Sequence, residues 1–160
     1  MIKVNIIAVG KLKEKYLTDG CNEYLKRLKA FAKVNIIEIN EYKSSDNPSP
    51  TEIETVKLKE GEAIISKIPK GSYVIPMCIE GKQLSSEELS KKLEDVSLGG
   101  CSELTFIIGG SFGLSDEVKK LGALKLSFGK ITLPHQLMRL VLLEQIYRAF
   151  SISNNSKYHK

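Results

Sequence analysis

Apolar and polar residues form regular blocks along this 160-residue chain. Short apolar runs predict strands at residues 2–9, 34–39, 73–79, 103–108 and 124–128. Between and after these runs, apolar residues recur at steps of three and four, which predicts helices at residues 12–31, 50–68, 85–96, 115–121 and 134–150. Strands that alternate with helices predict a single α/β domain over residues 1–160, with a largely parallel sheet between two helical layers.

Local signals mark several boundaries of these elements. Ser49 and Ser85 each stand three positions before a glutamate, which is the spacing of a capping box at the start of a helix. Pro76 lies inside the third predicted strand, where it cannot donate a hydrogen bond to a neighbouring strand. We therefore expect this strand either to end or to bend at the proline.

The last predicted helix is apolar around nearly its whole circumference. A helix of this kind is buried on more than one side. A sheet covers only one side, so we expect a second copy of the chain to cover another and predict a homodimer. At least one of Leu140, Leu143 and Ile146 is then expected at the subunit interface. The alternative is a central core helix within one chain.

Two of the predicted strands run into glycine-containing loops before the next helix begins. These loops are Gly109–Gly113 and residues 128–133. Such transitions build ligand sites at the carboxyl ends of strands in α/β proteins. The first loop has neither the G-x-G-x-x-G order of dinucleotide sites nor the Lys-Ser/Thr ending of a P-loop. The second carries one charged residue, Lys130, so both loops predict a largely neutral ligand held by backbone groups and apolar side chains.

The composition is that of a globular protein, with 42% hydrophobic and 27% charged residues. Three scattered cysteines form no C-x-x-C pair, which indicates reduced thiols and a cytoplasmic location. With only two histidines in the chain, we expect no metal site. No apolar run approaches the length of a membrane span, so we expect no membrane partner.

Basic residues gather toward both ends of the chain, although the net charge is only +5. Residues 125–160 hold six basic residues and a single acidic one, Glu144, and residues 10–33 hold seven basic and three acidic residues. Two basic ends suggest a polyanionic partner, of which RNA is the commonest for a cytosolic domain. The alternative is a solvated surface that happens to be basic.

Several short motifs occur in an order that resembles one known family. They are Ile108-Gly109-Gly110-Ser-x-Gly113-Leu114, Leu133-Pro134-His135-Gln136, Glu144-Gln145-x-Tyr147-Arg148-Ala149 and the terminal Tyr158-His159-Lys160, with Val9-Gly10-Lys11 and Glu23-Tyr24-x-Lys26-Arg27 nearer the start. The set resembles the RlmH family of the SPOUT superfamily, methyltransferases that act on N3 of a pseudouridine in 23S ribosomal RNA of the large subunit. The resemblance covers essentially the whole chain.

This resemblance implies a sheet of five to six strands and a C-terminal segment that threads through a loop as a deep trefoil knot, an exception to the usual absence of threading. It also implies S-adenosylmethionine (SAM) as methyl donor without a metal, and a homodimer that acts on ribosomal RNA in the large subunit or the assembled ribosome. The implied SAM contacts are Met77, Gly109, Phe128, Gly129, Lys130, Ile131, Thr132 and Leu133. Met77 stands where the family usually has leucine, and the apolar contact is retained.

The three terminal residues offer an aromatic ring, an imidazole and an ammonium group in succession. On composition alone, such a terminus is expected to be frayed. The groups also suit a flipped RNA base, which Tyr158 would stack on, His159 would deprotonate and Lys160 would hold by phosphate. In a dimer, each tail is expected to reach the neighbour's cavity. His135, at the start of the last helix, is expected to be structural rather than catalytic.

Two other functions are compatible with the sequence. A non-catalytic ribosome-binding factor would dock through the basic ends and use the knot only as a scaffold, but a scaffold does not need Gly109 and Gly129. A phosphate-binding enzyme would hold an anion at Ser111 or Ser115, before a helix. The absence of lysine and arginine from Gly109 to Asp116 argues against that enzyme.

Overall fold

Five strands form one parallel sheet in the order β2-β1-β4-β3-β5. The structure is a computed structural model that describes all of residues 1–160. The strands are β1 (Ile2–Val9), β2 (Ala32–Ile39), β3 (Tyr73–Gln83), β4 (Glu103–Ile108) and β5 (Leu126–Ser127). The helices are α1 (Lys15–Leu28), α2 (Pro50–Lys67), α3 (Ser86–Leu98), α4 (Asp116–Lys120) and α5 (His135–Ser153). Every predicted element is present, with shifts of a few residues at the ends.

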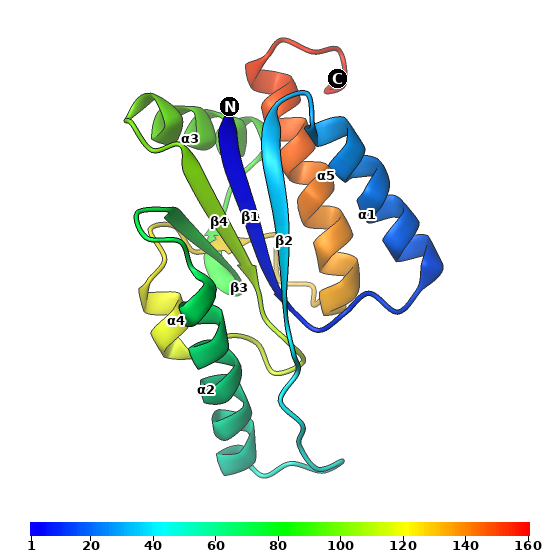
Figure 1. The fold of residues 1–160 in the computed structure, drawn as a ribbon, viewed down its shortest axis with the longest axis vertical. Helices are drawn as coiled ribbons and strands as arrows, with labels where there is room; N and C mark the ends of the chain where they lie inside the picture. The colour runs from blue at the N-terminus through cyan, green and yellow to red at the C-terminus, as the bar shows by residue number, and fades with distance from the viewer.

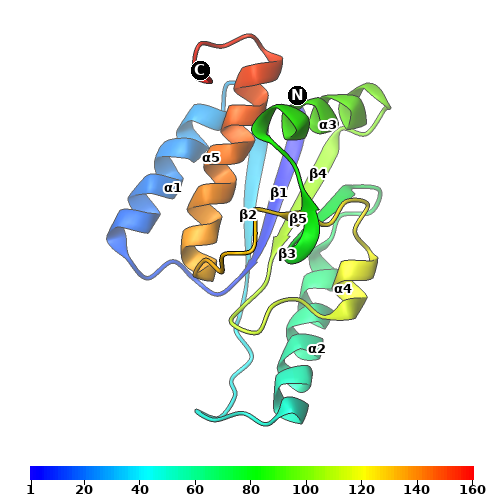
Figure 2. The ribbon, with the colours of Figure 1, turned by 180° about the vertical axis from the view of Figure 1, so that it is seen from behind.

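Helices cover both faces of the sheet and so complete three layers (Figure 1, and from behind in Figure 2). Successive side chains of a strand point to opposite faces. In β1, Ile6 therefore enters the core shared with α1, α3 and α5, whereas Ile7 enters the core shared with α2 and α4. The predicted three-layer parallel α/β fold is confirmed.

Strand β3 does not end at Pro76, although its pairing with β4 does. Beyond the proline, β3 pairs with β5 through Met77 and Lys82, with a shift of register between them. Because proline cannot donate to a ladder, the strand changes partner at this position. The new pairing is close: a β-carbon at Gly81 would lie 2.8 Å from the carbonyl carbon of Leu126.

Helix α5 lies on the sheet between α1 and α3, which explains why it is apolar all round. Leu143 and Ile146 have no exposed surface within one chain. Of the three positions predicted for a subunit interface, these two are therefore closed to a second copy, and the half-buried Leu140 is left. Leu140 is also in contact within the chain, since a β-carbon at Gly20 of α1 would lie 3.0 Å from its methyl groups. The central core helix, given above as the alternative, describes these positions correctly.

Candidate functional site

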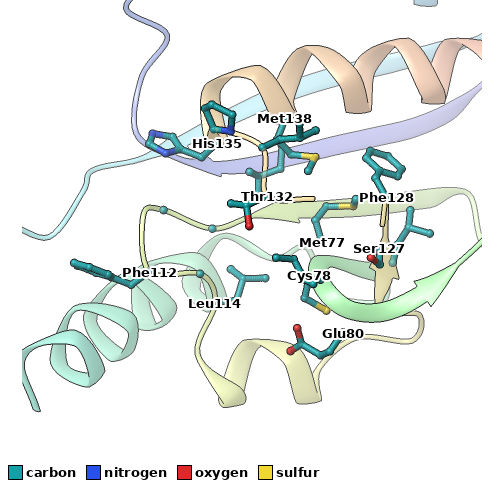
Figure 3. Close-up of a pocket in the computed structure, with 18 of the residues that line it drawn as sticks. Met77, Cys78, Glu80, Phe112, Leu114, Ser127, Phe128, Thr132, His135 and Met138 are labelled. Atoms are coloured by element: carbon teal, nitrogen blue, oxygen red, sulfur yellow. The ribbon is translucent and has the colours of Figure 1, made fainter. Parts of the chain in front are cut away.

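A cavity of about 630 Å³ opens at the carboxyl ends of β4 and β5, beside the part of β3 that follows Pro76 (Figure 3). Three stretches of chain form most of its wall: residues 77–80, residues 108–114, and residues between 126 and 138. This edge of a parallel sheet is where α/β proteins bind ligands. The volume lies within the range of pockets for small molecules and cofactors.

The structure gathers nearly all the residues implied as SAM contacts around this cavity. The lining includes Met77, Gly109, Phe128, Gly129, Ile131, Thr132 and Leu133. Lys130 is the exception, because it is exposed and does not line the cavity. Ile131 is 81% exposed, which leaves an apolar surface at the cavity free for a ligand or a partner to cover.

The two loops need glycine for different reasons. Gly129 has a φ of +118°, a conformation that other residues rarely adopt, and a β-carbon there would meet nothing within 4 Å. Gly109 is confined by its own chain, since a β-carbon there would lie 2.9 Å from the carbonyl carbon of Gly113. A side chain at Gly109 would therefore distort the loop itself before it met any ligand.

Sequence reasoning missed several side chains in the wall. They are Cys78, Glu80, Phe112, Leu114, Lys119 and Met138. Cys78 and Glu80 could have been predicted from the sequence, because they follow Met77, an implied SAM contact, in the same strand. Lys119 gives no such signal, because the packing of α4 through the fully buried Val118 brings it to the cavity.

The charges in the wall are balanced. Glu80 and Lys119 are the only carboxylate and ammonium groups that line the cavity, and their Oε1 and Nζ atoms lie 2.5 Å apart. The hydrogen bond between them raises the pKa of Lys119 and lowers that of Glu80. Burial raises the pKa of the neighbouring Cys78 thiol, so this thiol is protonated at neutral pH. The cavity therefore presents no unpaired cation.

The first turn of α5 forms one side of the cavity and is tied to the ends of β1 and β2. Arg139, only 3% exposed, donates from Nη1 to Glu38 Oε2 at 2.8 Å and from Nη2 to the carbonyl oxygen of Gly10 at 3.1 Å. His135 lines the cavity, and its Nε2 lies 3.6 Å from Oε1 of Glu41. These contacts fix where α5 begins.

A buried carboxyl group lies under the glycine loop. Glu60 of α2 is 5% exposed, and its Oε2 accepts a hydrogen bond from the backbone N–H of Tyr42 at 3.0 Å. Its Oε1 has no hydrogen-bond partner and lies 3.0 Å from where a β-carbon of Gly110 would be. Burial raises the pKa of Glu60. The loop at the cavity thus rests on a group that is costly to ionise.

The C-terminal tail is folded onto its own chain, so the frayed end expected from composition is wrong. The hydroxyl of Tyr158 donates to Glu144 Oε1 at 3.1 Å and lies 3.2 Å from the hydroxyl of Tyr24. Its ring meets Tyr147 edge-on at 4.7 Å, and the Arg148 guanidinium lies 4.8 Å from its centroid. Burial and these hydrogen bonds raise the pKa of Tyr158, which is a neutral phenol.

His159 is held through both ring nitrogens. Arg148 Nη1 lies 3.0 Å from Nδ1, and a guanidinium can only donate, so Nδ1 accepts. The proton is therefore on Nε2, which lies 2.6 Å from Oε1 of Glu87 in α3. In this position neither nitrogen is free to take a proton from a substrate.

The tail and the cavity contact different parts of α5 (Figure 1). His135 and Met138, at the start of the helix, line the cavity, whereas the tail folds back along the second half of the helix as far as Glu144. Glu144 lies nine residues beyond His135, which is about 14 Å along the helix. The residues proposed for base recognition and those proposed for SAM are therefore not brought together within one chain.

The structure contains no group of three or more His, Cys, Asp or Glu side chains that could hold a metal ion. None of the helices combines the length and apolar character that crossing a bilayer requires.

Together, the fold and the site define a parallel α/β protein with a cofactor-sized cavity at the carboxyl edge of its sheet. A family model described as a predicted SPOUT methyltransferase matches residues 2–159. The chain belongs to the SPOUT methyltransferase family.

Full-length relatives identify the group within this family. The chain is 55% identical over 159 residues to the ribosomal RNA large subunit methyltransferase H of Streptococcus gordonii, which covers 99% of this chain and 100% of the relative. It is 54% identical, with the same coverage, to the protein of that name from Enterococcus faecalis. The resemblance to the RlmH family is confirmed.

Solved structures share the fold at much lower identity. The tRNA (m1G37) methyltransferase of Aquifex aeolicus has a TM-score of 0.52 and 15% identity, covering 91% of this chain and 69% of its own. A putative methyltransferase from Legionella pneumophila, solved with bound SAM, has a TM-score of 0.50 and 11% identity, covering 95% of this chain and 66% of its own. The predicted trefoil knot is consistent with membership of the SPOUT family.

Proposed function

We propose that this chain is a SAM-dependent methyltransferase that modifies N3 of a pseudouridine in 23S ribosomal RNA and acts as a homodimer. The observation that carries the proposal is the cavity, because it is built from the loops into which the family resemblance places the SAM contacts. The RNA substrate is supported by relatives that are named for ribosomal RNA methylation and match the chain over its whole length.

The residues of the cavity fit SAM. Met77, Phe128 and Leu133 offer apolar surface to an adenine ring, and Gly129 leaves its backbone open to a ligand. A sulfonium is destabilised by a nearby unpaired cation, and the one ammonium group in the wall, Lys119, is paired. When bound, SAM supplies a methyl group on a positively charged sulfur.

The terminal residues would prepare the RNA base. N3 of a uracil-type ring carries a proton that must leave for the nitrogen to accept a methyl group, and His159 is the base that we assign to it. Nδ1 of His159 becomes able to accept this proton once the tail leaves Arg148. The neutral Tyr158 ring would stack on the base, and the exposed Lys160 would contact phosphate.

A second copy of the chain would bring tail and cavity together. Because the tail of each chain lies outside that chain's own cavity, a tail would act on its neighbour's cavity. Leu137 and Val141 are suited to the contact between copies, since they are half-buried, four residues apart and outside both cores. The homodimer proposed here therefore uses a different part of α5 from Leu143 and Ile146.

Exposed basic residues favour an RNA partner. Those in and around α1 are Lys11, Lys13, Lys26, Lys29 and Lys33, all of them without a salt-bridge partner. Lys26 and Lys29 lie at the end of α1, which packs against α5 in the helical layer that also carries the tail. Contacts of lysine with phosphates supply most of the sequence-independent affinity for RNA.

The phosphate-binding alternative is less well supported. Ser115 Oγ accepts a hydrogen bond from the backbone N–H of Val118, which makes it the cap of α4 and occupies the group proposed for an anion. Lys119, which lies beyond the loop, does line the cavity, but it is neutralised by Glu80. A non-catalytic scaffold would have no need of a cavity with this lining.

Binding and transfer assays test the proposal together. Calorimetry should show binding of SAM and none of ATP, and radiolabelled SAM should methylate ribosomes that lack the modification. Ribosomes that already carry it are the control and should accept no label. Binding of ATP without SAM would favour the phosphate enzyme. Docking to ribosomes without SAM binding would favour the scaffold.

A further inference from the structure

Glu80 and Lys119 stand out because they are the only carboxylate and ammonium groups in the wall of the cavity, and they pair with each other. Glu80 comes from the part of β3 that pairs with β5, and Lys119 comes from α4. The Lys119 side chain is 21% exposed and that of Glu80 is 56% exposed, so both can still reach a ligand. The proposed mechanism does not use either group.

The chemistry of SAM matches this pair. Besides the sulfonium, SAM carries an α-ammonium and an α-carboxylate group on one carbon atom. A ligand that enters the cavity loses water from these groups, and a charged group that is left without a partner costs free energy. Elsewhere the wall offers them no opposite charge. Glu80 Oε1 and Lys119 Nζ lie only 2.5 Å apart. The α-ammonium and α-carboxylate groups of SAM are attached to one carbon atom, so they can contact Glu80 and Lys119 at the same time.

We propose that Glu80 and Lys119 bind the amino-acid end of SAM. Glu80 accepts hydrogen bonds from the α-ammonium group, and Lys119 donates to the α-carboxylate group. This assignment rests on the proposed function and explains the ligand selectivity of the cavity. The ion pair distinguishes SAM from adenosine compounds that lack the amino-acid end. The adenosine part is then bound by the loops, independently of the ion pair.

A matched pair of ligands isolates this interaction. S-adenosylhomocysteine and 5′-methylthioadenosine both carry a neutral sulfur, and only the former has the amino-acid end. We expect the wild-type chain to prefer S-adenosylhomocysteine by about tenfold or more, the size of charge-assisted hydrogen bonds. In Glu80→Gln with Lys119→Gln, this preference should disappear while the Kd for 5′-methylthioadenosine stays unchanged. Glu117→Gln with Lys120→Gln, two exposed positions on the same helix α4, is the control.

The single variant Lys119→Gln tests the role of the ammonium group on its own. Lys119→Gln should weaken binding of SAM but leave decarboxylated SAM unaffected, because that ligand has no carboxylate. Circular dichroism and thermal melting should show that all variants remain folded.

Four results would overturn the assignment. Equal loss of both neutral-sulfur ligands would place Glu80 on the ribose or show that the pair only shapes the cavity. An unchanged preference in the double variant would show that the amino-acid end lies elsewhere. If the wild type binds S-adenosylhomocysteine and 5′-methylthioadenosine equally, the subsite alone fails, whereas no binding of SAM or of either of these ligands removes the proposed function as well.

Discussion

The hydroxyl of Tyr158 donates a hydrogen bond to the carboxylate of Glu144 at 3.1 Å and so fastens the C-terminal tail to the middle of α5. Glu144 also accepts from Arg148, whose guanidinium in turn contacts His159. One carboxylate of the helix thus organises the groups that we assign to the RNA base. The tail is bound to its own chain and must be released before it can act at the cavity of a second chain.

Removing the Tyr158 hydroxyl should loosen this tail. Tyr158→Phe keeps the ring but loses the bonds to Glu144 and Tyr24, which should cost about 1 kcal/mol. Trypsin should then cleave after Lys157 about fivefold faster, as mass spectrometry of the lost tripeptide would show. Tyr16→Phe, at an exposed tyrosine of α1, is the control. An unchanged cleavage rate would mean that the hydroxyl does not hold the tail.

The sequence predicted the layers of the fold better than it predicted the site. Apolar runs were sufficient to locate the strands, because the central strands β1 and β4 are buried on both faces and need a continuous apolar sequence. The two-residue β5 and the change of partner at Pro76 could not be predicted, because they depend on how the strands pair in space.

Within the site, the loops were accessible from the sequence and the ion pair was not. Gly109 and Gly129 follow strands and belong to recognisable motifs. Lys119 and Glu80 are 39 positions apart in sequence and meet only because α4 packs against the sheet. The apolar circumference of α5 could not be assigned from the sequence, since periodicity cannot tell whether α1, α3 or a second chain covers a helix.

Gly129→Val should impair SAM binding without damage to the core. A branched side chain at a φ of +118° forces the loop into another conformation, at a cost of about 1–2 kcal/mol, but meets no neighbour within 4 Å. Calorimetry should show at least tenfold weaker binding of SAM. Gly100→Val imposes similar strain at a φ of +99° in the loop before β4, away from the cavity, and should bind SAM normally. Equal affinities in the two variants would place the ligand elsewhere.

Gly109→Val is a different experiment, because the new side chain would meet the backbone of Gly113. We expect this variant to lose SAM binding together with thermal stability.

Charged substitutions on α5 should separate folding from dimerisation. Val141→Asp alters a half-buried position outside the cores and should give a folded monomer, as sedimentation and circular dichroism would show. Leu143→Asp introduces a charge at a position without exposed surface and should leave the chain unfolded or insoluble. If the Val141→Asp protein sediments as a dimer at micromolar concentration, the interface does not include this part of α5.

Glu60 should make the stability of the chain depend on pH. Burial raises its pKa in the folded chain, so the folded state binds this proton more tightly than the unfolded state does. The ionised group therefore costs stability at pH 7, and the cost fades as the pH falls through the folded pKa and below the ordinary carboxyl pKa of about 4.3. Glu60→Gln should raise the midpoint of thermal unfolding at pH 7 by about 2–4 °C, and this gain should shrink toward pH 4. A pH-independent gain, or the same profile in the exposed control Glu62→Gln, would show that ionisation of Glu60 is not responsible.

Mixed dimers should reveal whether the tail acts on its own chain or on its neighbour. A chain that lacks residues 158–160 should bind SAM and dimerise normally but transfer no methyl group, because the groups that handle the RNA base are missing. A chain with Gly129→Val should be inactive for the opposite reason, since its tail is intact and its cavity is impaired.

When the two variants are refolded together, a dimer of one copy of each contains one intact cavity and one intact tail, on different chains. If the tail crosses to the neighbour, this dimer has one complete site, and methyl transfer to ribosomes should recover to about half the rate of a wild-type dimer. Each variant refolded alone gives the background rate of methyl transfer. No recovery in a mixed dimer whose formation is verified by mass spectrometry would mean that each tail swings back to its own cavity, or that the tail takes no part in the reaction; a tail-deleted chain that methylates at the wild-type rate would establish the second.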